Sequence, residues 1–196
     1  IFKGIFMDKE KLVICDLDGT LFDTRRVNYH AYREALELAG LPVNFNYDFY
    51  VKRCWGPTYR GFLPLMGVPA ERFEEIHDLK KTLYEKNLHY AQENTHLFNI
   101  IEALHPTYHT CVVTSGSHNS KDILKHFNRY DLFEAIFTID DVKCGKPDPE
   151  GFFKAMNYFK VKPENTLIFE DSAVGVEAAR HTGASLCIVD DFKEKY

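Results

Sequence analysis

Short apolar runs recur along the chain, each with the length of a single buried strand. We predict strands over 12–15, 110–113, 135–139, 166–169 and 185–189. Helical patterns precede or separate the later four, over 97–104, 118–127, 149–159 and 173–181. This alternation predicts an α/β fold with a Rossmann-like parallel sheet covered on both faces. In such sheets ligands bind beyond the carboxyl ends of the strands.

The region 25–95 breaks the alternation. It contains a predicted helix over 27–39, a stretch punctuated by glycine and proline over 55–69, and a long charged helical pattern over 70–92. No segment there must join the sheet as a strand. We therefore predict a small α-helical cap domain, residues 25–95, inserted into an α/β core of residues 1–24 and 96–196. The role of residues 1–11 stays open.

The composition of the chain limits the kinds of partner that it can bind. The 196-residue chain is 45% hydrophobic, which suits a globular protein with a buried core. Its net charge is -5 and its lysines and arginines are scattered, which argues against a nucleic-acid partner. No run approaches the about 18 apolar residues of a membrane span, and the start lacks the pattern of a signal peptide. We expect a soluble cytoplasmic protein, a monomer or weak homodimer.

The chain has five cysteines, an odd number, and no CxxC pair. Three of them lie within or against predicted strands. Buried reduced thiols are therefore favoured over disulfides or metal ligands, which also suits a cytoplasmic protein.

Four polar segments follow predicted strands: DLDGT at 16–20, TSGS at 114–117, KPDP at 146–149 and EDS at 170–172. A parallel sheet would bring all four to one edge. Each segment alone is also a common turn or helix cap. Together they supply acidic groups for a cation, a hydroxyl and backbone donors for phosphate, and a lysine. Their joint presence predicts phosphoryl transfer.

The acidic segments predict a metal. Carboxylates such as Asp16 and Asp171 would repel one another unless a cation lay among them, and oxygen ligands favour Mg²⁺. Asp16 is the predicted nucleophile, whose attack on phosphorus gives an aspartyl phosphate. Asp18, two residues further, can protonate the leaving oxygen and later take a proton from the hydrolytic water.

The other two segments predict phosphate binding. The hydroxyl of Thr114 and the backbone amides of Ser115 and Gly116 can hold phosphate oxygens where a helix begins. Lys146 is followed by two prolines that stiffen its loop, so its ammonium can be aimed at the nucleophile and the phosphate.

The segments CDLDGTLFDT, VVTSGS, CGKPDP and IFEDSAVGVEAARHTGA resemble the four motifs of the haloacid dehalogenase-like hydrolase superfamily. The resemblance runs from about residue 12 to 189 and is to the beta-phosphoglucomutase-like and phosphatase branch with a helical cap. It implies that Asp16 is the nucleophile and that Asp18 is the acid/base, with its backbone carbonyl as a metal ligand. It implies that Thr114, with Ser115, holds the phosphate and that Lys146 stabilises charge. It also implies that Asp171, with Glu170 assisting, forms the Mg²⁺ site.

Within that superfamily the residues favour hydrolysis of phosphate esters. A dehalogenase does not need a second carboxylate at position 18, and related phosphonate hydrolases typically have a small residue there. The mutases have a histidine four residues after the DT of the first motif, where this chain has Asn28. His30 lies on another helical face. We predict a Mg²⁺-dependent phosphatase for a small phosphorylated metabolite such as a sugar phosphate, with a phosphosugar mutase as the alternative.

A third possibility is a catalytically silent binding module, which the intact acidic and lysine positions argue against. Substrate choice is predicted to come from the cap, where RCWGPTYR combines cations and aromatic rings. Arg53 and Arg60 would suit a second anionic group, and Trp55 and Tyr59 a sugar face. An equally acceptable interpretation is a turn between cap helices, with exposed arginines and a packed Trp55.

Overall fold

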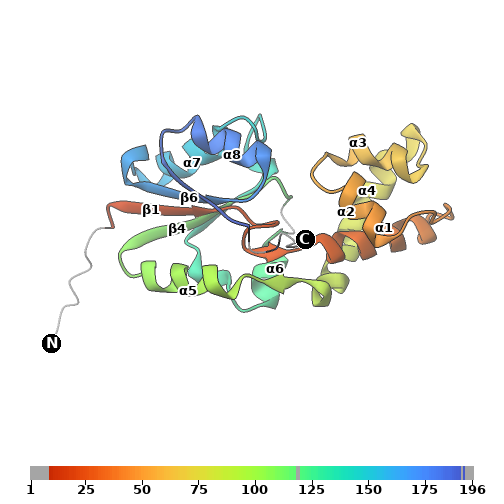
Figure 1. Cartoon of the computed structure of the whole chain (residues 1–196), viewed down its shortest axis with the longest axis horizontal. Coiled ribbons are helices and arrows are strands. Elements are labelled where there is room, and N and C mark those ends of the chain that lie inside the picture. Colours follow the sequence, from red (N-terminus) through yellow and green to blue (C-terminus); the bar gives the residue numbers. More distant parts are fainter. Residues whose placement is uncertain (1–8, 118–119, 191, 193–196) are drawn as a thin grey trace. The chain divides into compact units, whose positions relative to one another are not determined.

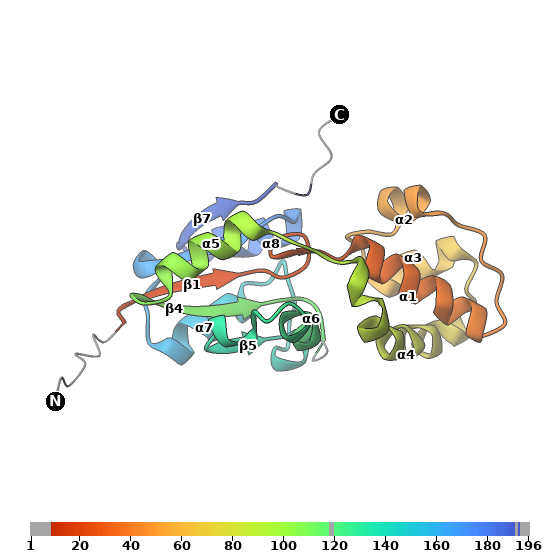
Figure 2. The ribbon, with the colours of Figure 1, turned by 90° about the horizontal axis from the view of Figure 1, so that it is seen from below.

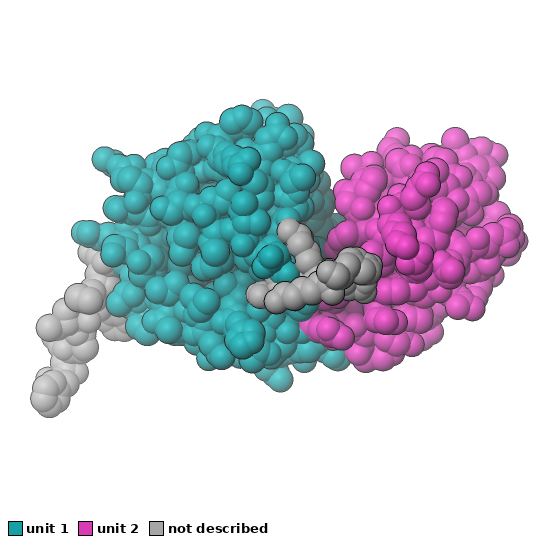
Figure 3. Space-filling view, viewed as in Figure 1, with its two compact units in different colours: residues 1–22, 93–196 teal, residues 23–92 magenta. Residues whose placement is uncertain are grey.

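The computed structural model describes residues 9–117, 120–190 and 192. The chain forms two compact units, residues 1–22 with 93–196 and residues 23–92 (Figure 3). It passes between them twice, and the two connecting segments pair as a short sheet of β2 (Phe22–Asp23) and β3 (Gln92–Glu93). Phe22 is completely buried in the first unit, where its ring lies 5.3 Å from that of Phe98.

The first unit, which we call the core, is built on a five-stranded parallel sheet in the order β5-β4-β1-β6-β7. The strands are β1 (Lys11–Cys15), β4 (Tyr108–Val113), β5 (Ala135–Phe137), β6 (Thr166–Glu170) and β7 (Ser185–Ile188). Helices α7 (Glu150–Phe159) and α8 (Ala173–Arg180) lie on one face (Figure 1). Helices α5 (Thr95–Leu104) and α6 (Ser120–His126) lie on the other, in front of the strands in Figure 2. The predicted α/β fold with a helical insert is confirmed.

Strand β1 is the centre of the core. Residues 12–15 are fully buried because β4 and β6 flank the strand and helices cover both faces of the sheet, which explains the unbroken apolar run. Around it packs a cluster of apolar side chains from four strands and from helices α7 and α8. The thiols of Cys15 and Cys111 are buried and unpaired, as predicted, whereas Cys144 and Cys187 are exposed. Cys187 is exposed on β7, an edge strand whose residues are exposed or half-buried.

The second unit, which we call the cap, is helical. It contains α1 (Arg25–Leu38), α2 (Tyr47–Arg53), α3 (Tyr59–Phe62) and α4 (Phe73–Tyr84), joined by 3₁₀ turns over Leu63–Met66, Ala70–Arg72 and Glu85–Tyr90. Its interior is rich in aromatic rings, which α1, α2 and α3 contribute. The rings of Tyr32 and Phe62, for example, meet edge to face at 5.1 Å. None of the helices among the described residues has both the length and the apolar character needed to cross a membrane.

The structure corrects three expectations. The helix predicted over 70–92 is split, because the buried Asn87 side chain donates to the Leu83 carbonyl, which a continuing α-helix would offer to the Asn87 backbone amide. The segment after it forms β3, a strand that the sequence did not predict. The strand predicted over 135–139 ends at Phe137, because Thr138 and Asp141 form a capping box that starts a 3₁₀ turn. The sequence left the role of residues 1–11 open, and residues 1–8 of that segment lie outside the described residues.

Candidate active site

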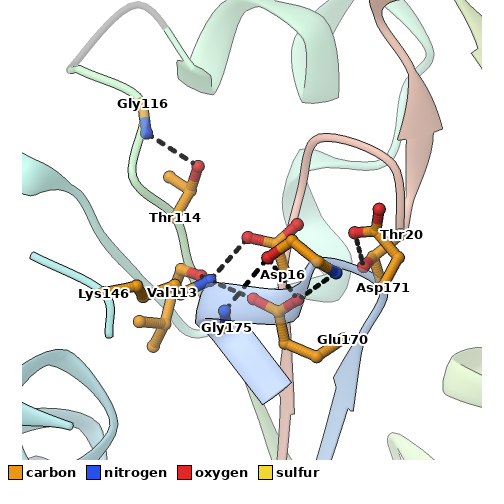
Figure 4. Close-up of polar contacts among 10 residues, drawn as sticks. Asp16, Thr20, Val113, Thr114, Gly116, Lys146, Glu170, Asp171 and Gly175 are labelled. Carbon is orange, nitrogen blue, oxygen red and sulfur yellow. Dashed lines mark hydrogen bonds and ion pairs between the residues drawn. The ribbon is translucent and has the colours of Figure 1, made fainter. Parts of the chain in front are cut away.

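Three of the four predicted segments begin where neighbouring strands end. Asp16 directly follows β1, Thr114 directly follows β4, and Glu170 is the last residue of β6. Because β1 lies between β4 and β6 in the sheet, these three positions are adjacent in space (Figure 4). Lys146 comes from the loop that precedes α7 and reaches the same place. Strand register therefore positions the acidic groups, whereas a loop positions the lysine.

The centre of this site is an ion-paired cluster. The Lys146 Nζ donates to Asp16 Oδ1 at 2.6 Å, to Glu170 Oε1 at 2.6 Å and to the Val113 carbonyl at 3.0 Å. The three charged side chains are almost completely buried, with 7%, 9% and 0% exposed for Lys146, Asp16 and Glu170. Buried charges are costly unless paired, so this cluster holds one cation firmly against two carboxylates.

Electrostatics in the cluster favour a further positive charge. Burial raises the pKa of Asp16 well above its usual range, and the neighbouring charges of Glu170 and Asp171 raise it further, against the opposing effect of Lys146. Burial alone would lower the pKa of Lys146, but Asp16 and Glu170 outweigh it and raise that pKa, so the lysine stays protonated. One cation therefore faces three carboxyl groups.

These three carboxyl groups fit a metal. Asp16, Glu170 and Asp171 each offer an oxygen, and the three oxygens lie within 4.8 Å of one another. Burial, followed by the charge of Glu170, raises the pKa of Asp171 to about 6, while a hydrogen bond from Thr20 opposes that rise. An oxygen-only donor set with excess negative charge suits Mg²⁺. Asp18 adjoins this group closely enough to raise the pKa of Asp171, although its carboxylate is not one of the three.

Two glycines and a threonine shape the side of the site where the three carboxyl groups meet, and the role of the threonine was not predicted from the sequence. Thr20 is fully buried, and its hydroxyl donates to Asp171 Oδ1 at 2.9 Å. Gly19 has φ +96°, and a Cβ there would lie 2.2 Å from Asp171 Oδ2. Gly175 approaches so closely that a Cβ would lie 1.7 Å from Glu170 Oε1. Because Thr20 belongs to the DLDGT segment, its place in the site could have been predicted from the sequence. The close approach of Gly175 to Glu170 is visible only in the tertiary structure.

The predicted phosphate-binding segment lies beside this cluster at the end of β4. Thr114 is buried, and its backbone amide donates to the Phe137 carbonyl at 2.9 Å. The Gly116 amide donates to Thr114 Oγ1 at 3.0 Å, so the structure places that donor on the threonine. Accepting this bond leaves the hydroxyl proton of Thr114 as a donor. Ser115 lies next to it and is exposed, in the bend that follows β4.

The four cap residues predicted to choose the substrate fall into two groups. Tyr59 and Arg60 are held within the cap: both donate to Glu74, at 2.8 and 2.6 Å, and the Tyr59 ring stacks on His77 at 3.9 Å. Arg53 is exposed at the last position of α2. Trp55 is half-buried against the aromatic interior of the cap. Their contact with a substrate stays a prediction.

Asn28 occupies the position that bears on mutase chemistry. It lies in the first turn of α1, and its side-chain amide donates to the Thr24 carbonyl at 3.0 Å. A neutral carboxamide of this kind cannot exchange a proton as a histidine does.

Comparison with known proteins agrees with this geometry. A family model described as haloacid dehalogenase-like hydrolase matches residues 13–189. A phosphorylated carbohydrates phosphatase from Thermotoga maritima is 31% identical over 178 residues, which cover 87% of this chain and 81% of the relative. A fructose-1-phosphate phosphatase from Escherichia coli is 27% identical, with 87% of this chain and 92% of the relative covered.

A solved structure shares the fold. A haloacid dehalogenase superfamily hydrolase of subfamily IA from Geobacter sulfurreducens has a TM-score of 0.73 at 22% identity, with 92% of this chain and 87% of that chain covered. The chain belongs to the haloacid dehalogenase-like hydrolase family, in the branch with a helical insert after the first strand. Within that branch it is a phosphatase, a phosphoric monoester hydrolase.

Proposed function

We propose that this phosphatase hydrolyses the phosphate monoester of a small, sugar-like metabolite through an aspartyl-phosphate intermediate on Asp16. The observation that carries the proposal is the buried cluster in which Lys146 pairs with Asp16 and Glu170 beside Asp171. The relatives whose names include phosphorylated carbohydrates and fructose 1-phosphate support the substrate class.

Asp16 acts as the nucleophile in this mechanism. One of its carboxylate oxygens attacks phosphorus as the bond from phosphorus to the leaving oxygen breaks. Asp18 gives its proton to that oxygen and, as a carboxylate, then takes a proton from the water that attacks the aspartyl phosphate. The second attack releases inorganic phosphate and restores both side chains.

Lys146 and Thr114 stabilise charge on the phosphoryl group. The Lys146 ammonium is fixed by three acceptors and excluded from water, so it neutralises developing negative charge without reorganising. The Thr114 hydroxyl donates to a phosphoryl oxygen, with the Ser115 amide as a second donor. Burial of the site strengthens each of these interactions.

Asp16, Asp171 and Glu170 are the side chains that would hold Mg²⁺, with the Asp18 carbonyl as a further ligand. When bound, the ion supplies charge neutralisation for the phosphoryl oxygens and for the carboxylate cluster. The excess of carboxyl groups over cations in the site supports this assignment.

Hydrolysis is favoured over phosphosugar isomerisation. The position that a mutase fills with histidine holds Asn28, whose amide is engaged by its own helix. Substrate selectivity is assigned to the cap segment 53–60. Within it, Arg53 and Trp55 are the better candidates, because Glu74 already binds Tyr59 and Arg60.

The test is phosphate release from a panel of sugar phosphates, nucleotides and short-chain phosphates, with and without Mg²⁺, for the unmutated chain and Asp16→Asn. We expect release of phosphate from a sugar phosphate only with Mg²⁺, and a loss of at least about 10³-fold in Asp16→Asn. Unchanged turnover by Asp16→Asn would remove the nucleophile assignment. Isomerisation of a hexose phosphate without phosphate release would establish the mutase alternative.

A further inference from the structure

The loop that carries Lys146 has few backbone contacts of its own. Between the 3₁₀ turn Ile139–Asp141 and the start of α7, residues 142–149 form neither strand nor helix. A segment without a hydrogen-bonded ladder relies on side chains to fix it. Yet the Lys146 ammonium must be placed within hydrogen-bonding distance of three acceptors. Some side chain outside the cluster must therefore hold the loop.

Glu150, the first residue of α7, makes those contacts. Its Oε2 accepts from the backbone amide of Cys144 at 2.8 Å, and both its oxygens accept from the backbone amide of Lys143 at 3.1 Å. These amides precede Lys146 by two and three residues. The backbone hydrogen bonds from Lys143 and Cys144 lower the pKa of Glu150, so it binds them as a carboxylate.

Two further contacts leave little freedom between this anchor and the lysine. The Asp148 amide donates to the Gly145 carbonyl at 3.0 Å, and Asp148 Oδ1 accepts from the Glu150 amide at 2.9 Å. Gly145 also approaches another segment closely, since a Cβ there would lie 2.6 Å from Ile139 Cδ1. The loop is thus tied on both sides of Lys146 to the first residue of α7.

We propose that Glu150 is a positioning residue for Lys146, acting through the backbone amides of Lys143 and Cys144; this inference rests on the proposed role of Lys146 in phosphoryl transfer. Glu150 touches none of the reacting groups. Without its carboxylate the loop loses its charge-assisted hydrogen bonds, and the Lys146 ammonium departs from the position in which it faces Asp16. A displacement of about 1 Å in such a group costs as much as 10²-fold in rate.

A simpler role for Glu150 is to stabilise the N-terminus of α7 by its negative charge. That role predicts lower stability with unchanged catalysis. The positioning role predicts a catalytic loss that depends on Lys146. A double-mutant cycle between Glu150→Ala and Lys146→Ala separates the two, because an effect transmitted through Lys146 disappears once that side chain is absent.

The experiment measures kcat with p-nitrophenyl phosphate at saturating Mg²⁺, tungstate binding by calorimetry as a readout independent of turnover, and thermal unfolding. We expect Glu150→Ala to lower kcat by about 10- to 100-fold, and Glu150→Gln, which keeps one acceptor oxygen, by less. In the Lys146→Ala background, Glu150→Ala should change neither residual kcat nor tungstate affinity by more than about twofold.

The matched control is Glu164→Ala, which removes an exposed carboxylate from a helical turn elsewhere in the core. This variant should resemble the unmutated protein in kcat, tungstate affinity and thermal unfolding.

Two results would overturn the inference: normal kcat and tungstate binding in Glu150→Ala, or an equal effect of Glu150→Ala with and without the Lys146 side chain. If Glu150→Ala does not fold, Glu150→Gln takes its place in the cycle, and an equal effect of Glu150→Gln with and without the Lys146 side chain overturns the inference. Full activity of Lys146→Ala would instead contradict the proposed mechanism itself, so the two failures are distinguishable.

Discussion

The core and the cap position their side chains by different means. In the core, Asp16, Thr114 and Glu170 lie at the ends of three adjacent strands, so backbone register sets where their side chains begin. In the cap, the candidate residues lie on or between the short helices α2 and α3, where side-chain contacts set their placement, such as those of Tyr59 with His77 and Glu74. A motif at a strand end therefore indicates where its side chains lie in the fold, whereas a motif between short helices indicates this much less.

The two units also differ in how tightly backbone and polar groups meet. The core site brings Gly175 against the carboxylate of Glu170 with no room for a methyl group, whereas in the cap Gly61 has its nearest neighbour, the Pro57 Cβ, at 3.5 Å from a built Cβ. Changes in the core should therefore affect chemistry strongly. Changes in the cap should affect stability and substrate preference more gently.

The largest effect is expected from a comparison of two helical glycines, Gly175 in the core and Gly61 in the cap. Gly175→Ala forces Glu170 away from its present position and so disturbs Lys146; we expect a loss of about 2–3 kcal/mol in the free energy of unfolding and roughly 100-fold in kcat. Gly61→Ala meets only ordinary contact distances and should change the unfolding free energy by no more than about 1 kcal/mol, in the stabilising direction. Denaturant unfolding and steady-state kinetics measure both, and similar outcomes for the two variants would refute the contrast.

A second prediction concerns the carboxyl groups of the core that are proposed to hold Mg²⁺. Thr20→Val keeps the shape of the side chain but removes the hydrogen bond to Asp171, which should weaken Mg²⁺ binding by about tenfold. Calorimetric titration with Mg²⁺ measures this without reference to turnover. Thr166→Val is the matched control. It removes a hydrogen bond from Thr166 to the Lys162 carbonyl, and Thr166 lies at the end of β6 opposite to Glu170 and the site. Equal Mg²⁺ affinities for all three proteins would show that Thr20 does not orient the ligand.

A third prediction concerns the pH dependence of the cap. Burial, and then the charges of Lys81 and Lys80, lower the pKa of His77 to about 4, and its Nδ1 lies 3.1 Å from the Tyr32 hydroxyl. The folded cap therefore favours the neutral ring. The contribution of the neutral His77 ring to the free energy of unfolding is fully present above the unfolded pKa of about 6.5. It is lost as pH falls toward 4, and the loss amounts to about 1–2 kcal/mol after allowance for the partial exposure of the ring.

Urea unfolding between pH 7 and pH 4 measures this effect. His77→Gln, whose side chain does not titrate, should show a shallower fall in stability over the same range. Parallel curves for the two proteins would mean that carboxylates elsewhere cause the acid sensitivity.

The smallest expected effect separates the two groups of cap residues. Arg53→Ala should raise KM for the preferred substrate by roughly fivefold, the equivalent of about 1 kcal/mol for an exposed charge. Arg60→Ala should change KM by less than about twofold, because Glu74 already occupies its guanidinium. Kinetics on the substrate identified by the panel decide the matter. A larger effect for Arg60→Ala would reverse the assignment within segment 53–60.

The sequence predicted the sheet and its family well for a specific reason. The central strand and its neighbours are buried on both faces, so their residues read as continuous apolar runs, and the polar residues that follow them stand out. The split of the 70–92 helix at Asn87 and the pairing of β2 with β3 were not predictable in the same way. Both depend on which partner a polar or extended segment finds in space.

By itself, the sequence determined the α/β class, the presence of a helical insert, and the gathering of Asp16, Thr114 and Glu170 at one sheet edge, because strand ends in a parallel sheet share that edge. Only the tertiary structure decided which contacts each side chain makes there. It placed the Gly116 amide on Thr114 and tied the lysine loop to Glu150. The physical reason is that hydrophobic periodicity records burial, a property of single positions, whereas hydrogen bonds and close approaches are properties of pairs that the chain brings together only on folding.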